Sequence, residues 1–330
     1  MSVVSANKDL VALYGPDIIH KAIENHVNFS CEASVGGGIP ILMPLHQSLA
    51  ANQIESIVGI LNGTTNYILS QMTETGVNYA NALADAQKQG FAEADPTNDV
   101  CGFDAARKLA ILSSIGFRAN VTFDDVLVEG IEKIDKSDIQ YAKDMGYTIK
   151  LLTVALRQEN GIALNVYPAF LPDNHPLSSV KGAYNAIYVT GNIVDDVMFY
   201  GRGAGALPTA SAVMGDVIST AQHILNGSTG TGMIMTDTKR IPFYSSLKLQ
   251  NSYYFRLDVD DVTGVLSQIA AAFAENDISI CEVVQKRKTK GLAELVLITE
   301  LASRESILQV EKALQVLPCM RKVANVIRVM

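Results

Sequence analysis

The sequence predicts a chain of α/β and α+β class in three parts, and three patterns support this prediction. Residues 1–35 follow the order strand, helix, strand, as in the closing part of an open α/β sheet. From Thr148 to Tyr200, strand-length segments alternate with hairpin turns, which indicates a mixed or antiparallel sheet. After a connector rich in Gly, Ser and Thr, the order from Tyr253 is strand, helix, strand, strand, helix, strand. That order is the split, ferredoxin-like βαββαβ arrangement.

The first unit has the element order of part of a Rossmann-type domain. A short strand rich in β-branched residues comes first, and we expect a helix to open at Gly15-Pro16-Asp17 and to run to His26, because proline suits a first helical turn. The next strand is predicted at residues 27–35. No Gly-x-Gly-x-x-Gly motif precedes this unit. We therefore expect only a remnant of a dinucleotide-binding domain, with most of that domain missing from this chain.

The following stretch alternates turns with helices. Three consecutive glycines at residues 36–38 suit either a ligand contact or a tight turn, and the sequence favours neither. The polar residues 62–66 can cap a helix or hydrogen-bond a ligand. A strand is predicted at residues 54–60. Helices are predicted at residues 42–51, 67–74, 79–89 and 103–114.

The second half is predicted to be rich in strands. The predicted strands of the sheet lie at residues 149–158, 162–170, 186–191 and 194–200. Such a sheet can carry a subunit interface or cover an active site. A glycine-rich turn at residues 201–209 then opens a long helix at 210–225, whose positive end can face phosphate, although a plain helix start explains the glycines equally well. The last unit is predicted to hold strands at 253–259, 278–286, 292–301 and 324–329 and helices at 265–276 and 303–317.

The chain is organised around residues 90–112, where charged residues lie among apolar ones. Asp104 and Lys108 are four residues apart and therefore share one helix face. An isolated pair of this kind is most simply a surface ion pair worth roughly 0.3 to 0.5 kcal/mol. Glu93 precedes the helix, where a turn can fold it back toward the same face. Two carboxylates and a lysine would then hold a substrate ammonium group and exchange a proton with a reacting oxygen.

Composition excludes several classes of partner. The net charge of −8 and the lack of a long basic run argue against nucleic acid, since the densest basic patch, residues 286–290, has the pattern of a hairpin turn. The four cysteines are widely spaced, without a paired metal spacing, which indicates reduced thiols in the cytoplasm. No apolar stretch reaches about eighteen residues and no secretion signal is present. We expect no membrane partner.

These motifs closely resemble homoserine dehydrogenase, and residues 253–330 resemble an ACT domain. The segments that carry the first resemblance are residues 5–8, 32–40, 59–66, 93–108 and 201–206. The resemblance implies an NAD(P)H-dependent reduction of L-aspartate 4-semialdehyde to L-homoserine, a step toward threonine, methionine and isoleucine. Hydride addition to an aldehyde creates an alkoxide, and a lysine ammonium near that oxygen stabilises the charge and delivers a proton.

The resemblance also assigns roles to individual residues. Lys108 would be the proton donor, and Lys8 a second catalytic candidate at the junction of cofactor and substrate. Glu93 and Asp104 would be the homoserine-binding carboxylates, and Asp99 is a further candidate substrate contact.

The resemblance assigns the cofactor and cation sites as well. Cofactor contacts would come from Lys8, Gly90, Glu93 and Gly205. The choice between NAD and NADP stays open, because the residue that contacts the ribose and distinguishes the two cofactors would lie in the missing part of the dinucleotide-binding domain. The backbone ligands of a monovalent cation, usually sodium, would be Val35, Gly37 and Ile39, with Glu32 beside them.

The expected domain organisation follows from the resemblance and the element pattern. Residues 1–28 and 203–236 would form the remnant of the dinucleotide-binding domain, residues 29–202 the catalytic and dimerisation domain, residues 237–252 a linker and residues 253–330 the regulatory ACT domain. We expect a homodimer or larger homo-oligomer. Threonine is the expected effector, bound between two such modules near residues 261–264; the simpler alternative is that the module only dimerises the enzyme.

Two functions of different classes stay open at this point. The first is an oxidoreductase with an amino-acid-sensing module. The second is a non-catalytic, amino-acid-binding regulatory fragment that keeps the substrate pocket and the sensor. Because the phosphate-cradling turn of the dinucleotide site is absent from the sequence, we expect the 330-residue chain not to reduce the aldehyde by itself.

Overall fold

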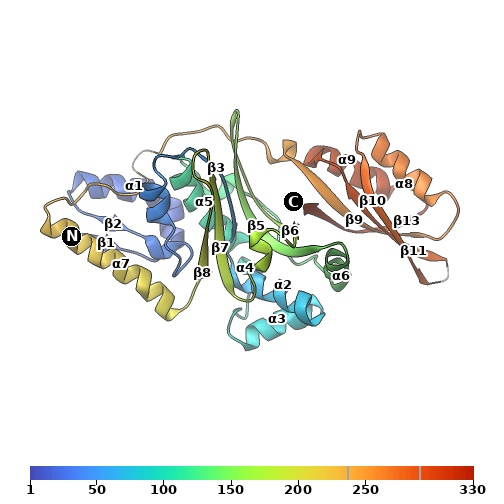
Figure 1. Cartoon of the computed structure of the whole chain (residues 1–330), viewed down its shortest axis with the longest axis horizontal. Coiled ribbons are helices and arrows are strands. Elements are labelled where there is room, and N and C mark those ends of the chain that lie inside the picture. Colours follow the sequence, from blue (N-terminus) through green and yellow to red (C-terminus); the bar gives the residue numbers. More distant parts are fainter. Residues whose placement is uncertain (236–237, 290) are drawn as a thin grey trace.

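The computed structural model describes residues 1–235, 238–289 and 291–330. Figure 1 shows three parts in a row: a small α/β unit that holds the N-terminus, a central sheet with helices packed against it, and a C-terminal module. Residue 290, in the predicted basic hairpin, and residues 236–237, in the predicted connector, lie outside the described residues. Within the described parts of the chain, no helix is long and apolar enough to cross a membrane.

The N-terminal unit is a parallel strand pair with two helices. Strands β1 (Val3–Val4) and β2 (Phe29–Ser30) pair in parallel, and α1 (Lys8–Glu24) connects them, which confirms the predicted element order. The predicted helix start was wrong, because α1 begins at Lys8 and Pro16 lies inside it. The Asn7 side chain accepts a hydrogen bond from the Leu10 amide at 3.0 Å and caps the helix. Helix α7 (Ala206–Leu225) packs against β1.

The predicted second strand is much shorter than expected. Only Phe29–Ser30 is a strand, and the short helix η1 (Glu32–Ser34) follows. The turn has a clear cause, because the Glu32 carboxylate accepts hydrogen bonds from the backbone amides of Ile41, Leu42 and Met43 at 2.5, 2.8 and 2.9 Å. These contacts fold the glycine-rich segment back onto η1 and fix the start of the next helical segment, which includes η2 (Pro44–Ser48).

The central sheet is antiparallel, as predicted. Its strands lie in the order β6, β5, β3, β7, β8, with antiparallel pairing throughout this run. The bounds are β3 (Ile54–Ile60), β5 (Tyr147–Gln158), β6 (Gly161–Pro172), β7 (Tyr184–Gly191) and β8 (Asp195–Arg202). The short strand β4 (Leu127–Val128) adds to β6 in parallel. Hairpin turns at residues 159–160 and 192–194 join the long pairs, as the turn residues indicate.

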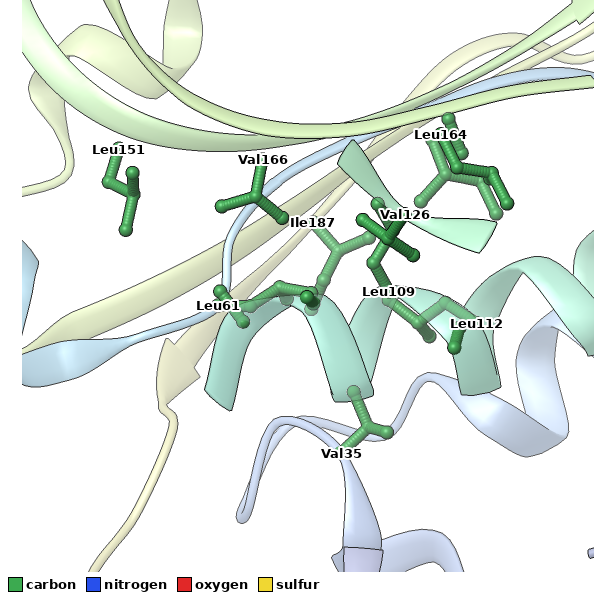
Figure 2. Close-up of a cluster of buried hydrophobic side chains, with 14 of the residues drawn as sticks. Val35, Leu61, Leu109, Leu112, Val126, Leu151, Leu164, Val166 and Ile187 are labelled. Carbon is green, nitrogen blue, oxygen red and sulfur yellow. The ribbon is translucent and has the colours of Figure 1, made fainter. Parts of the chain in front are cut away.

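Helix α5 (Phe103–Gly116) is the central element of the core. Figure 2 shows α5 between strand β6, which carries Leu164 and Val166, and the loop that carries Val35, with Leu109 and Leu112 buried in this core. The other helices of this part are α2 (Gly63–Thr75), α3 (Tyr79–Lys88), α4 (Thr97–Val100), η3 (Phe123–Asp125), α6 (Lys136–Asp144) and η4 (Pro176–Ser179). Because Lys108 directly precedes Leu109, burial of the apolar face fixes the position from which Lys108 extends.

Helix α2 begins earlier than the predicted residue 67. The Asn62 side chain accepts a hydrogen bond from the Thr65 amide at 2.8 Å, so Asn62 caps the helix and Gly63 is its first residue. The polar turn at residues 62–66 is therefore mostly helical. This brings the Asn62 side chain to the N-terminal end of α2, next to α4 and α5.

The C-terminal module has the predicted βαββαβ order. Its elements are β9 (Gln250–Asp260), α8 (Val265–Ala274), β10 (Ile280–Thr289), β11 (Leu292–Thr299), α9 (Arg304–Gln315) and β13 (Met320–Val329), with the short strand β12 (Ala302–Ser303) beside β9. Its sheet has the order β10, β11, β9, β13. Ser303 caps α9, as predicted, by accepting a hydrogen bond from the Ser306 amide at 3.0 Å.

The module is joined to the central sheet by hydrogen bonds that the sequence pattern did not indicate. Strand β13 pairs in parallel with β6, with Arg328 beside Ala169 and Val329 beside Phe170, so the module and the central part share one sheet, which has 11 strands among the described residues. The C-terminus therefore ends between the two parts (Figure 1). Within residues 238–249, the Lys239 amide donates a hydrogen bond to the Arg118 carbonyl of the central part at 3.0 Å, and η5 (Ser246–Lys248) follows.

Candidate functional site

A cleft of about 790 Å³ lies where the N-terminal unit meets the central part. Its walls come from the start of α1, the glycine-rich segment after η1, the cap of α2, the turn after α3, the α4 and α5 segment, and the loops before β7 and α7. The lining residues with ionisable or amide side chains are Asn7, Lys8, Asp9, Asn62, Asp99, Asp104, Lys108, Asn185 and Arg202. The structure thus brings Lys8, Asp99, Asp104 and Lys108 together, as the sequence analysis anticipated.

The Asp104 and Lys108 side chains form the predicted pair on one face of α5. The Lys108 Nζ donates to Asp104 Oδ2 at 2.6 Å and to the Leu61 carbonyl at 2.9 Å. Both side chains are largely buried, with 13% and 11% of their surface exposed. An ammonium group has three N–H donors, so these two bonds leave one for a ligand in the cleft. This geometry excludes the simple surface ion pair.

Asp104 holds a second cation as well. The Lys8 Nζ lies 3.4 Å from Asp104 Oδ1, and the Asn62 amide donates to Asp104 Oδ2 at 2.9 Å. Burial favours the neutral carboxyl, but the Lys108 ammonium and the hydrogen bonds outweigh it and hold the pKa of Asp104 below its usual value. Asp104 therefore stays ionised and acts as the counterion that fixes both lysines.

Asp99 has a different environment from its neighbour. Burial, reinforced by the charge of Asp104, raises the pKa of Asp99 although the Asn62 amide donates to its Oδ1 at 2.7 Å. Asn62 therefore bridges both carboxylates through its amide nitrogen. Two carboxylates whose pKa values are shifted in opposite directions can take separate roles in one site. The sequence indicates Asn62 only as a helix cap or a ligand contact, because nothing in its spacing places it against α5.

Glu93 does not join the cluster in this structure. Its side chain is exposed, it does not line the cleft, and its backbone carbonyl accepts a hydrogen bond from Gln87 Nε2 at 3.1 Å. Gly90, with φ of +76°, turns the chain after α3 and lines the cleft together with Phe91. The fold-back of Glu93 expected from the sequence is therefore wrong for this structure, because the turn presents residues 90–91 to the cleft and carries Glu93 outward.

Glycines form the wall near the start of α7. A Cβ atom on Gly37, which has φ of +54°, would lie 2.4 Å from the Gly203 carbonyl oxygen, and one on Gly203 would lie 2.1 Å from Asn185 Nδ2. A side chain on Gly37 would therefore collide with the backbone of Gly203, whereas one on Gly203 would collide with the Asn185 side chain. Gly205 precedes the first turn of α7 and lines the cleft. The positive end of a 20-residue helix and the Lys8 ammonium thus border the same cleft, which suits an anionic group such as phosphate.

The proposed cation ligands lie on the same glycine-rich segment. Among the described residues, no hydrogen bond uses the backbone carbonyls of Val35, Gly37 or Ile39. Oxygen atoms are the ligands that hard cations take. The Glu32 carboxylate, by contrast, is occupied by three backbone amides, so its side chain is a structural cap. No cluster of three or more His, Cys, Asp or Glu residues suited to a metal was found in the described ranges.

Comparison with known proteins extends along nearly the whole chain. The homoserine dehydrogenase family model matches residues 40–218 and the ACT domain model matches residues 253–319. A homoserine dehydrogenase of Bacillus subtilis is 41% identical over 330 residues, which cover 99% of this chain and 76% of that protein. The crystal structure of a homoserine dehydrogenase from Thiobacillus denitrificans has a TM-score of 0.94 and 37% identity, over 100% of this chain and 76% of that one.

A further solved structure has a bound nucleotide. It is a hyperthermophilic archaeal homoserine dehydrogenase mutant in complex with NADPH, with a TM-score of 0.59 and 28% identity, and the match covers 67% of this chain and 64% of that one.

Proposed function

Since the chain belongs to the homoserine dehydrogenase family and is an oxidoreductase with an ACT domain, we propose that it serves the NAD(P)H-dependent reduction of L-aspartate 4-semialdehyde to L-homoserine. The observation that carries this proposal is the Lys108 ammonium, which is held 2.6 Å from a buried, ionised Asp104 at the wall of the cleft. The intact cluster favours an enzyme over the alternative of a non-catalytic regulatory fragment. The product would feed threonine, methionine and isoleucine synthesis.

Lys108 has the geometry of a proton donor to the substrate oxygen. Two of its N–H donors hold Asp104 and Leu61, and the third is left for the aldehyde oxygen. As the oxygen becomes an alkoxide, the ammonium stabilises its charge and then transfers a proton. Asp104 keeps Lys108 in place during this step. Asp99, on the other side of Asn62, is the carboxylate we assign to the substrate ammonium group, and Glu93 would need a different turn conformation to contribute.

The same cleft has groups that suit a dinucleotide. The archaeal relative was solved with NADPH, and we infer the same class of cofactor, NAD or NADP, for this chain. A bound nicotinamide supplies the hydride. Lys8, Gly90 and Gly205 are the lining residues that we expect to contact the cofactor, and Lys8 lies between this region and Asp104. The expected loss of most of the nucleotide-binding domain stays a prediction.

We also propose a sodium site and a regulatory role for the module. The carbonyls of Val35, Gly37 and Ile39 are the candidate sodium ligands, with Glu32 holding the segment in shape. The C-terminal module is proposed to sense threonine in a cytoplasmic homodimer. Its attachment through β13 and β6 supports coupling, because a change in the module has a continuous sheet through which to act.

The test of the proposed function is NADPH- and NADH-dependent reduction of aspartate semialdehyde by the purified protein. Asp104→Asn removes the counterion of Lys108 and should lower turnover by about 10²-fold. Asp124→Asn makes the same chemical change at an exposed position and should leave turnover unchanged. Equal activity of the two variants would remove Asp104 from the site. Homoserine formation by the purified 330-residue chain would support the proposal and contradict the expectation from the sequence that this chain is inactive by itself. No homoserine formation with either nucleotide would contradict the proposal.

A further inference from the structure

Asn185, near the start of β7, is a buried residue in the wall of the cleft that Lys108 also lines. Only 1% of its surface is exposed. Among the described residues, no group donates a hydrogen bond to its side-chain oxygen Oδ1. Most buried polar atoms have a partner, because burial takes away their hydrogen bonds to water. An unpaired acceptor at the wall of a cleft is therefore a candidate contact for a ligand.

The Asn185 side chain is confined between two glycines. A Cβ atom on Gly203 would lie 2.1 Å from Nδ2 and 2.6 Å from Oδ1, and one on Gly63 would lie 3.6 Å from Oδ1. The backbone before Asn185 is also fixed, because Asn66 Nδ2 donates to the Tyr184 carbonyl at 2.9 Å. A side chain held in this way has little freedom, which suits a group that orients a ligand.

A buried lysine supports the same segment from behind. Lys150 Nζ donates to Asn66 Oδ1 at 3.0 Å and to the Val180 carbonyl, which also accepts from Asn66 Nδ2 at 3.2 Å. These bonds join β5, α2 and the loop before β7. The position of Asn185 is thus set by three elements of the central part.

Asn185 lies between the two halves of the cleft. On one side, Gly63 directly follows Asn62, which bridges the carboxylates of the candidate site. On the other side, Gly203 belongs to the loop that ends at Gly205, the cap residue of α7. The first side is where we expect the substrate, and the second is where we expect the cofactor. The unpaired oxygen is therefore placed where the two would meet.

The chemistry of this acceptor distinguishes between the two ligands. The substrate ammonium group is charged and binds more strongly to a carboxylate, such as that of Asp99 in the same cleft, than to an amide oxygen. The nicotinamide ring carries a carboxamide, which is neutral and has N–H donors and a carbonyl acceptor. An asparagine amide has the complementary acceptor and donors. The buried neutral acceptor therefore fits the carboxamide better than the ammonium group.

We propose that Asn185 accepts a hydrogen bond from the carboxamide of the nicotinamide cofactor and thereby orients the ring beside Lys108. This inference rests on the proposed function and adds a cofactor contact from β7. The Gly203 backbone covers the Asn185 amide, so the contact requires the loop at residues 203–205 to shift. The carboxamide is attached to the ring carbon next to the one that carries the hydride. A fixed carboxamide therefore directs that carbon toward the substrate.

The test compares two nucleotides that differ only at this group. In the reduced 3-acetylpyridine analogues of NADH and NADPH, a methyl ketone replaces the carboxamide and the N–H donors are lost. The purified protein is titrated by calorimetry with NADPH, NADH and both analogues. The parent should bind the nicotinamide form at least about 10-fold more tightly than its analogue. In Asn185→Leu, this preference should fall below about 3-fold, because the acceptor is gone.

Asn165→Leu is the matched control. Asn165, in β6, is also 1% exposed and its Nδ2 has no partner among the described residues, but it does not line the cleft. This variant should keep the preference of the parent. Asn185→Leu removes an unpaired buried acceptor, so its midpoint of thermal unfolding should be no lower than that of the parent. Asn185→Ala serves as the second variant if leucine does not fit beside Gly203.

Three results would overturn the inference. The first is a preference for the carboxamide that persists in Asn185→Leu and Asn185→Ala, or an equal loss of affinity for both nucleotides. The second is a lower unfolding temperature of both variants, which would make Asn185 a structural residue. The third is that the parent binds none of the nucleotides. Selective binding of the nicotinamide form without reductase activity would contradict the proposed function and leave the inference in place.

Discussion

Two regions of the molecule each pair a buried carboxylate with at least one cation, but only one of them leaves bonding capacity unused. Where α6 meets strands β9 and β13 of the C-terminal module, Asp138 accepts hydrogen bonds from Arg256, Tyr254, Asn325 and its own cap residue Asp135, and it has no exposed surface. In the candidate active-site cleft, Asp104 holds two lysines that line open space. A saturated ionic cluster fixes one arrangement of two domains, whereas an unsaturated one at a cleft can exchange a partner for a substrate.

The largest stability effect is expected at the saturated cluster. Asp138→Ala leaves the Arg256 guanidinium buried with only part of its compensation and should lower the free energy of unfolding by about 3 to 5 kcal/mol. Urea unfolding measures this. Asp144→Ala, which breaks the half-exposed pair with Lys286, is the control and should change stability by less than about 1 kcal/mol. If the two variants lowered the free energy of unfolding by similar amounts, the distinction between the saturated cluster and a surface ion pair would be wrong.

An effect on stability of intermediate size is expected at a buried cation, Lys150, whose hydrogen-bond acceptors are both neutral. Lys150 is buried and donates to Asn66 Oδ1 at 3.0 Å and to the Val180 carbonyl, while Glu74 and the like-charged Lys181 lie farther out. Burial lowers the pKa of Lys150 from 10.5 to about 8. Below pH 8 both states bind the proton, but between pH 8 and 10.5 the unfolded state binds more, so stability contributed by this group rises with pH.

The size of this effect is testable by difference. The free energy of unfolding of the parent, minus that of Lys150→Met, should rise by roughly 1 to 3 kcal/mol from pH 8 to pH 10. Lys181→Met, at the exposed pair with Glu74, should show no such pH-dependent difference from the parent. A difference that stays constant with pH would mean that Lys150 keeps its proton in both states.

The smallest effect is expected at a buried carboxylate without a cation. Asp216 accepts a hydrogen bond from the Glu32 amide at 2.9 Å, and burial together with the Glu32 charge raises its pKa to about 6. Asp216→Asn removes this charge and keeps an acceptor, so at pH 7 it should stabilise the protein by about 0.5 to 1 kcal/mol. The gain should vanish near pH 4, because the native carboxyl is then already neutral. A loss of stability at pH 7 would contradict this account.

Sequence reasoning predicted the parts of the molecule that depend on local pattern. Three features were predicted correctly: the run of strands from β5 to β8, the βαββαβ order of the module, and the shared helix face of Asp104 and Lys108. Each of them follows from the residue period of a strand or a helix within a short stretch of sequence. The start of α1 was predicted wrongly because Pro16 was taken as a start signal, whereas the Asn7 cap lies two turns earlier.

The other differences depend on contacts between distant segments. Asn62 bridges two carboxylates 37 and 42 residues away, and β13 pairs with β6 across more than 150 residues. No local pattern encodes such distances. The fold-back of Glu93 was inferred from proximity in sequence, but the turn at Gly90 decides the direction of the chain and takes Glu93 away from the cleft.

The most direct test of the difference between the two clusters is to measure turnover and the free energy of unfolding together for Lys108→Ala. Lys88→Ala, at the exposed end of α3, serves as the control. Lys108→Ala should lower the turnover of aspartate semialdehyde by about 10² to 10⁴, while the free energy of unfolding changes by less than about 1 kcal/mol because the lysine sits at a cleft. Turnover within a factor of about three of the control, together with a large loss of stability, would show that the Asp104 and Lys108 pair is structural.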